Sequence, residues 1–178
     1  MKNLFALSIL AASVAMTACS KKPEETTPAT GAAATTASAS GATIIKIGHA
    51  APLTGPQAHL GKDNENGVRL AVDELNAKGL TIGGQKVQFE LHSEDDQADP
   101  RIATTVAQKF VDDKVNVMIG HLNSGTTIPA SRIYNDAGIV EISPSATNPK
   151  YTQQGYKGAF RVMANDVQQG KVLGEFAV

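Results

Sequence analysis

From Ala42 onward the sequence alternates between short β-branched runs and longer amphipathic runs, and this alternation most constrains the fold. Strand-like runs occur at 43–48, 87–91, 115–120 and 139–142, with a fifth candidate at 160–162. A strand–helix–strand order with short connections places the strands parallel in one sheet, with helices on both faces. The sequence therefore predicts an α/β fold.

Helical patterns fill the intervals between these strands. The expected helices cover 61–78, 100–111, a segment from Ser124 or Thr126 to Tyr134, and 167–178. In the first helix the stripe Val68, Ala71, Val72 and Leu75 is expected to be core, and Gly79 is placed as its C′ residue. Asp99 is placed as the N-cap of the second helix, and 82–85 as a turn. Glu141, inside the fourth strand, is expected to face outward or to pair at the sheet edge.

The amino-terminal residues 1–18 have the pattern of a secretory signal, a lysine followed by a short apolar run and then small residues. The run ends at Met16-Thr-Ala-Cys19, which resembles the lipobox of bacterial lipoproteins, although that motif usually has leucine where Met16 stands. The resemblance implies cleavage before Cys19 and lipidation of its thiol. An ordinary secretory signal with an incidental cysteine is the alternative.

Residues 19–41 are almost entirely Thr, Ala, Ser, Gly and Pro after a short charged start. So little apolar bulk does not offset the entropy of ordering, about 1–2 kcal/mol per residue, so we expect a flexible tether. The expected location is therefore the periplasm or cell surface, with the protein lipid-anchored to a bacterial membrane.

Composition excludes several classes of function. With 16 basic and 17 acidic residues, the chain lacks the charge excess of a protein that neutralises nucleic-acid phosphates. Its single cysteine forms no internal disulfide, and its four histidines lack metal-ligand spacing. Asp95 and Asp96 are adjacent loop residues, so we do not expect them to act as a catalytic acid/base couple. The sequence predicts no cofactor, no metal and no nucleic-acid partner.

Ligands of parallel α/β sheets bind beyond the carboxyl ends of the strands. The segments there are 50–60, 95–99, 121–127 and 143–148. The segments 121–127 and 143–148 offer hydroxyls and free amides and contain no arginine. Such groups suit the carboxylate of a small zwitterion better than a multiply charged phosphate. Capping by Ser124 or Thr126 is the alternative interpretation of the third segment. No Walker-type phosphate loop is present.

Several separated motifs resemble the leucine/isoleucine/valine-binding proteins of bacterial ABC importers. They are Pro52-Leu-Thr-Gly-Pro, Asn76-Ala-Lys-Gly, Asp95-Asp-Gln-Ala-Asp-Pro, Ile119-Gly-His-Leu-Asn-Ser-Gly-Thr-Thr and Ile142-Ser-Pro-Ser-Ala-Thr-Asn-Pro. The resemblance covers Ile44 to about Gly170. It implies a type I periplasmic binding protein that closes two lobes on an amino acid, with 42–164 as an incomplete first lobe and 165–178 as the start of the crossover to the second. The last helix keeps an uncovered apolar face, so we expect further residues, and most of the second lobe, after Val178.

The resemblance also assigns residues to the ligand. Ser124 and Thr147 are expected to bind its carboxylate, and the backbone carbonyl of Ser145 its ammonium group. Leu60 stands where the family often has an aromatic residue lining the pocket. A disulfide found in some members would need cysteines at Ala98 and Asn123, and both are absent.

These observations predict the substrate-binding component of an ABC importer for branched-chain or related aliphatic amino acids, working with permease subunits and not as an enzyme. One alternative is a sensor of amides or urea on the same fold. The other is a lipoprotein hydrolase that uses Ser124, although no Gly-x-Ser-x-Gly elbow surrounds that serine.

Overall fold

The computed structural model describes residues 41–178. The predicted signal segment 1–18, the tether 19–41 apart from Gly41, and the predicted lipidation of Cys19 lie outside the described residues. Those three predictions stay predictions. No helix within the described range combines the length and the apolar character needed to cross a membrane.

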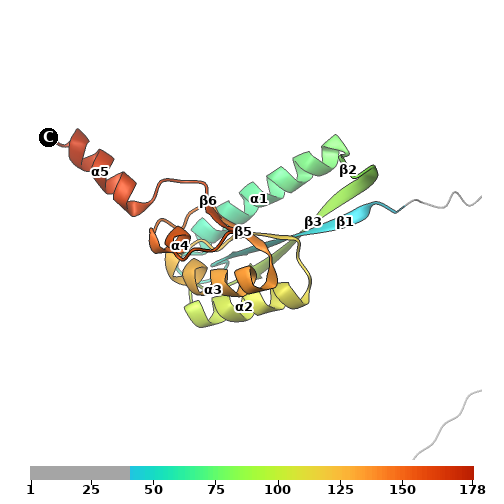
Figure 1. The fold of residues 1–178 in the computed structure, drawn as a ribbon, viewed down its shortest axis with the longest axis horizontal. Helices are drawn as coiled ribbons and strands as arrows, with labels where there is room; N and C mark the ends of the chain where they lie inside the picture. The colour runs from blue at the N-terminus through green and yellow to red at the C-terminus, as the bar shows by residue number, and fades with distance from the viewer. Residues whose placement is uncertain (1–40) are drawn as a thin grey trace, which may run out of the picture. The chain divides into compact units, whose positions relative to one another are not determined.

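Within residues 41–178, six strands form one sheet in the order β2-β3-β1-β4-β5-β6 (Figure 1). Their bounds are β1 Thr43–Ala51, β2 Thr81–Ile82, β3 Gln85–Asp95, β4 Val117–Gly120, β5 Val140–Ser143 and β6 Ala159–Arg161. Strand β1 pairs in parallel with β3 and β4, and the β4–β5 and β5–β6 pairs are parallel too. Only β2 runs antiparallel, paired to β3 across the turn predicted at 82–85. The predicted parallel sheet is confirmed.

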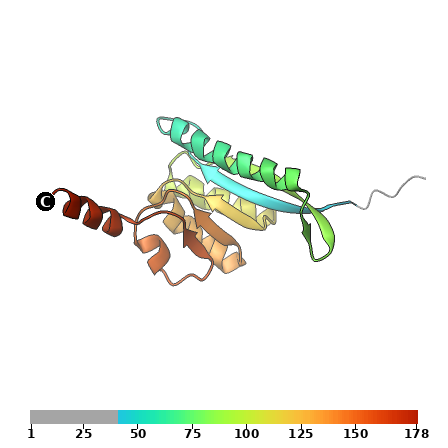
Figure 2. The same cartoon turned by 90° about the horizontal axis from the view of Figure 1, so that it is seen from above.

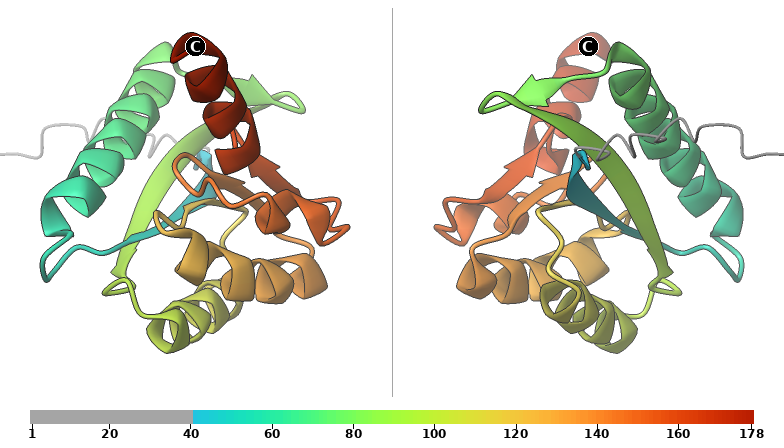
Figure 3. Two further views of the ribbon diagram at one scale, coloured as in Figure 1. Left: turned by 90° about the vertical axis from the view of Figure 1, so that its left-hand side faces the viewer. Right: turned by 90° about the vertical axis from the view of Figure 1, so that its right-hand side faces the viewer.

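In the described part of the chain, five helices connect or follow the strands: α1 Ala58–Lys78, α2 Pro100–Asp112, α3 Ser124–Ala137, α4 Lys150–Gln153 and α5 Asp166–Phe176. Helix α1 lies on one face of the sheet, while α2 and α3 lie side by side on the other (Figure 3). The prediction that helices cover both faces is therefore confirmed. Short α4 was not predicted, because four residues are too few for a helical repeat to be recognised in a sequence.

The main core lies between the sheet and the α2–α3 pair. Met118 and Ala50 of the sheet pack there against Val106 and Phe110 of α2 and Tyr134 of α3, all of them buried. Burying a side chain the size of Phe110 stabilises the fold by about 1.5–3 kcal/mol. Asp99 caps α2 as predicted, because its carboxylate accepts from the N–H groups of Arg101 at 2.7 Å and Ile102 at 3.2 Å.

The opposite face of the sheet is covered only in part. Of the predicted α1 stripe, Val72 is buried, Val68 and Leu75 are half-buried and Ala71 is exposed. The prediction that this whole stripe is core is therefore wrong. The reason is that α1 contacts β1 and β3, and no second helix of the described chain lies beside it on that face (Figure 2).

Helix α5 extends away from the rest of the described chain (Figures 1 and 2). None of its residues is buried, and Leu173 and Phe176 are 67% and 90% exposed. The side chain of Asn165 caps the helix by accepting from the N–H of Gln168 at 2.9 Å. Its apolar face is uncovered in this structure, as its sequence pattern predicts.

Candidate functional site

Strands β1, β4 and β5 are neighbours in the sheet, so their carboxyl ends meet at one edge. The predicted site residues come from the segments that follow these three strands. Leu60 lies in the first turn of α1, after β1, and Ser124 is the first residue of α3, after β4. Ser145 and Thr147 lie in the loop between β5 and α4. All but Leu60, which is 46% exposed, are half-buried.

Hydrogen bonds join the segments that follow β4 and β5. The backbone N–H of Asn148 donates to Ser124 Oγ at 3.1 Å, and Ser145 Oγ donates to the carbonyl of Leu122 at 3.1 Å. Deeper in the edge, Ser143 Oγ donates to the carbonyl of His121 at 2.8 Å. The two strand ends therefore lie together, as the parallel topology predicts.

The polar groups at this edge differ in what they still offer a ligand. The hydroxyl oxygen of Ser124 accepts from the protein, so its proton remains free to be donated. Ser145 directs its hydroxyl proton to Leu122. The hydroxyl of Thr147 has no hydrogen-bond partner within residues 41–178, whereas its backbone carbonyl accepts from the N–H of Asp166 at 2.9 Å.

The N-cap position of α3 is occupied by a residue other than Ser124 and Thr126, and its side chain makes no capping hydrogen bond. Asn123 is the N-cap, and its carbonyl accepts from the hydroxyls of Thr126 and Thr127, each at 2.8 Å. Both threonine side chains donate, so neither caps an N–H group, and Ser124 accepts from Asn148 instead. The interpretation that Ser124 or Thr126 caps this helix is wrong. A helix start of this kind attracts negative charge.

Another hydrogen bond crosses the edge near Leu60. Asn123 Nδ2 donates to Oε1 of Gln57, the N-cap residue of α1, at 2.8 Å. We did not predict this contact. The preference of asparagine for N-cap positions could have identified Asn123 as the start of α3. Its partner could not have been identified, because the two residues are 66 positions apart in the sequence.

Beneath the edge lies a buried polar cluster. His121 Nδ1 lies 2.7 Å from Asp96 Oδ2, and His121 Nε2 lies 3.2 Å from the hydroxyl of Tyr134. All three residues are fully buried. Both ring nitrogens of His121 are thus occupied, so this histidine has no nitrogen left to activate a serine. Within residues 41–178, no three His, Cys, Asp or Glu side chains are arranged to hold a metal ion.

The neighbouring Asp95 serves another segment. Its carboxylate accepts from the N–H groups of Leu53 and Gln97, both at 2.8 Å. Burial alone would raise the pKa of Asp95, but these bonds and one from the Thr54 hydroxyl hold it below the usual value. Asp95 therefore fixes the loop after β1 while Asp96 binds His121. As expected of adjacent residues, the two carboxylates have no common partner.

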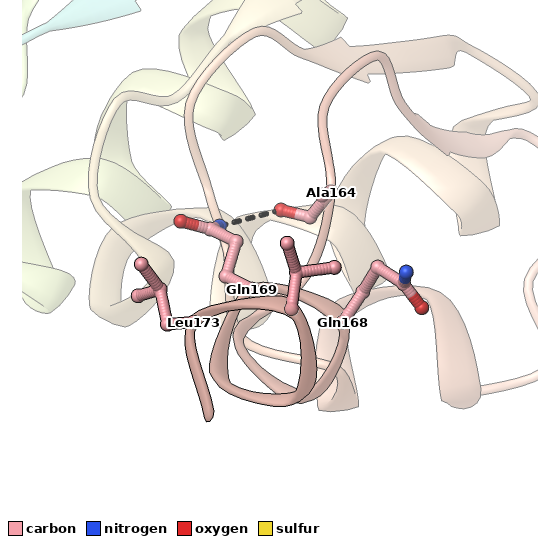
Figure 4. A pocket seen from close by; sticks show the side chains of 5 residues that line it. Ala164, Gln168, Gln169 and Leu173 are labelled. Atoms are coloured by element: carbon pink, nitrogen blue, oxygen red, sulfur yellow. Dashed lines mark hydrogen bonds between the residues drawn. The ribbon is translucent and has the colours of Figure 1, made fainter. Parts of the chain in front are cut away.

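The hollow in Figure 4 lies elsewhere. Its lining residues are Ala164, Gln168, Gln169, Val172 and Leu173, most of them from α5. Gln169 Nε2 donates to the carbonyl of Ala164 at 2.8 Å, which ties the helix to the segment before it (Figure 4). None of the predicted site residues lines this hollow.

Comparison with known proteins gives consistent results. A family model described as periplasmic binding protein matches residues 44–178. Leu/Ile/Val-binding protein homolog 1 of Brucella abortus (strain 2308) is 45% identical over 132 residues, which are 74% of this chain and 35% of that protein. The leucine-, isoleucine-, valine-, threonine- and alanine-binding protein of Pseudomonas aeruginosa is 41% identical over 135 residues, 76% of this chain and 35% of that protein. The chain thus spans about a third of the length of these curated relatives.

Solved structures show the same architecture. The branched-chain amino acid transporter substrate binding protein LivJ from Streptococcus pneumoniae, in complex with isoleucine, superposes with a TM-score of 0.69 at 34% identity. The alignment covers 75% of this chain and 38% of that one. The predicted fold class, a parallel α/β lobe of the type I periplasmic binding protein kind, is confirmed.

Proposed function

This chain belongs to the periplasmic binding protein family, and from that premise we propose that it is part of the substrate-binding component of an ABC importer. We propose branched-chain or related aliphatic amino acids as its ligands. The names of the relatives support this proposal, since they describe binding of leucine, isoleucine and valine. The observation that carries it is the meeting of uncharged hydrogen-bond donors where β4 and β5 end.

In the proposed binding mode, the ligand carboxylate accepts from the hydroxyls of Ser124 and Thr147 and from free amides at the start of α3. The backbone carbonyl of Ser145 accepts from the ligand ammonium, and Leu60 contacts the ligand side chain. The free proton of Ser124 supports its role, and so does the hydroxyl of Thr147, which has no hydrogen-bond partner within residues 41–178. Each hydrogen bond to a charged group contributes about 1.5–3 kcal/mol, so a few such bonds hold a zwitterion without an arginine.

Closure of a second lobe completes the proposed mechanism. In this mechanism a second lobe closes over the bound amino acid, and the permease subunits recognise the closed form. The protein performs no covalent chemistry. It lies outside the cytoplasmic membrane, in the periplasm or at the cell surface, and is anchored through acyl chains on Cys19.

The test uses the complete gene product and its Ser124→Ala/Thr147→Ala variant. Because two hydrogen bonds to a charged group are lost, leucine affinity should fall at least about 100-fold in isothermal titration calorimetry. Thr105→Ala is the matched control, since it removes an exposed hydroxyl on α2 that bonds only to the carbonyl of Arg101. Unchanged leucine binding in a folded double variant would remove Ser124 and Thr147 from the site.

Two other functions are separated by simple measurements. A thermal-shift screen of the complete gene product against the twenty amino acids and small amides distinguishes an amino-acid binder from an amide or urea sensor. Turnover of ester or amide substrates would instead support a Ser124-dependent hydrolase. The occupied nitrogens of His121 argue against the hydrolase.

A further inference from the structure

Two helices begin at the proposed ligand edge, and their N-cap residues bond to each other. Gln57 is the N-cap of α1 and Asn123 the N-cap of α3, and neither side chain accepts from an N–H group of its own helix. Instead Asn123 Nδ2 donates to Gln57 Oε1 at 2.8 Å. The bond joins the segment after β1 to the segment after β4.

This arrangement is unfavourable for α3 considered alone. Asparagine is among the residues that best stabilise a helix start, because its side-chain oxygen normally accepts from the second or third N–H group. Here Asn123 makes no such bond, and its Oδ1 is buried without a partner in the described part of the chain. The contact with Gln57 is therefore made at the expense of capping, and helix stability does not explain it.

The two bonded residues flank the proposed subsites. Asn123 directly precedes Ser124, which is proposed to hold the ligand carboxylate. Gln57, the N-cap of α1, lies three residues before Leu60, which is in the first turn of that helix. The bond therefore fixes the distance between Ser124, which is proposed to hold the ligand carboxylate, and Leu60, which is proposed to contact the ligand side chain.

We propose that the Gln57–Asn123 hydrogen bond is a positioning pair that sets the ligand's side-chain specificity, and this inference rests on the proposed function. With the bond in place, the span suits an aliphatic side chain of fixed length. Without the bond, the loop after β1 moves relative to α3. The contact with Leu60 then discriminates less between ligands with long and with short side chains. Hydrophobic pockets discriminate by as little as one methylene group, so a small loosening changes the discrimination.

The test compares the dissociation constants of leucine and alanine in the complete gene product. Gln57→Met keeps the length of the side chain but removes the acceptor, and we expect the alanine-to-leucine ratio of dissociation constants to fall at least about threefold. The exchange Gln57→Asn/Asn123→Gln keeps the combined length and polarity of the pair, and should restore the ratio to within about twofold. Should Gln57→Met fail to fold, the shorter Gln57→Asn takes its place, with the same expected ratio.

Two controls separate this role from others. Gln85 also accepts a side-chain hydrogen bond, from Thr43 Oγ1 at 3.0 Å, but it lies at the opposite end of β3 from the proposed site. Gln85→Met should leave the ratio unchanged. Ser124→Ala should weaken both amino acids by the same factor.

The outcomes distinguish this inference from the proposed function. If the native protein binds leucine and Gln57→Met preserves the ratio, the positioning role is wrong while the proposed function stands. If Gln57→Met lowers the alanine-to-leucine ratio of dissociation constants and the exchange Gln57→Asn/Asn123→Gln does not restore it, the positioning role is also wrong. If the native protein binds neither amino acid, the proposed function fails, and this inference fails with it.

Discussion

At the scale of single residues, Glu141 is a carboxyl group buried in the core. It is 1% exposed, and neither of its carboxyl oxygens has a hydrogen-bond partner within the described residues. The hydroxyl of Tyr151 donates to its backbone carbonyl at 3.1 Å instead. The expectation that Glu141 faces outward is wrong. Glu141 lies opposite the core residue Met118 in the β4–β5 register, so it points to the core side, and β6 covers the strand edge.

Burial of Glu141 has a consequence for stability. Burial raises the pKa of this carboxyl well above 4.5. In the folded state it therefore keeps its proton at pH values where the unfolded chain has lost it. The free energy of unfolding thus decreases as pH rises from about 4.5 to the folded pKa, by at most about 1.4 kcal/mol per pH unit.

Replacing Glu141 with glutamine should remove this pH dependence. Glutamine is neutral in both states, so Glu141→Gln should gain stability relative to the native chain at pH 8 and gain little at pH 4.5. Urea unfolding at several pH values measures the difference. Equal slopes of stability against pH in the two proteins would mean that Glu141 is ionised in the folded state.

At the scale of elements, the start of α1 depends on one close backbone contact. A Cβ atom added at Gly61 would lie 2.0 Å from the carbonyl oxygen of Pro52. Only glycine lets the helix approach the loop after β1 this closely. The contact fixes the first turn of α1, which carries Leu60.

Alanine substitutions at two glycines of α1 should therefore have opposite effects. Gly61→Ala forces the helix away from Pro52 and should destabilise the fold by about 1–3 kcal/mol. Gly67→Ala, in the same helix, adds a Cβ that meets no atom within 4 Å apart from the neighbouring helix backbone, and should stabilise the fold by up to about 1 kcal/mol. Thermal unfolding of both variants measures the two effects. A Gly61→Ala variant as stable as Gly67→Ala would contradict the contact.

At the scale of the whole molecule, stability is unevenly distributed over the described residues. Helix α3 has five buried residues, among them Tyr134, whereas α5 has none. Short helices without packing are marginal in water, since most helical stability in proteins comes from a buried face. The lobe therefore consists of a packed centre and a weakly held carboxyl-terminal helix.

Amide hydrogen exchange on the chain ending at Val178 should detect this difference. Amides of α5 should exchange within about tenfold of the rate of an unstructured peptide, because the helix opens locally. Amides in the second half of α3 should be protected at least about 1000-fold, as their opening requires the core to unfold. Comparable protection in both helices would show that α5 is held by contacts absent from the structure.

Local patterns predicted much of the described lobe. The alternation of apolar residues gave the parallel strands, Asp99 marked the start of α2, and Gly79 marked the end of α1 in its left-handed conformation. The motifs around Ser124 and Thr147 led to the family. Each of these signals acts within a few residues, because capping, turns and helical or strand periodicity depend on near neighbours in the chain.

Other features depended on contacts between distant segments. The sequence alone determined the order of the elements other than β2 and α4, the parallel sheet and the edge at which Ser124, Ser145 and Thr147 meet. Only the tertiary structure revealed the Gln57–Asn123 bond, the burial of Glu141 and the partial cover of the α1 stripe. Each of these features depends on contacts between segments that meet only when the sheet is assembled. A local pattern of residues carries no information about such neighbours.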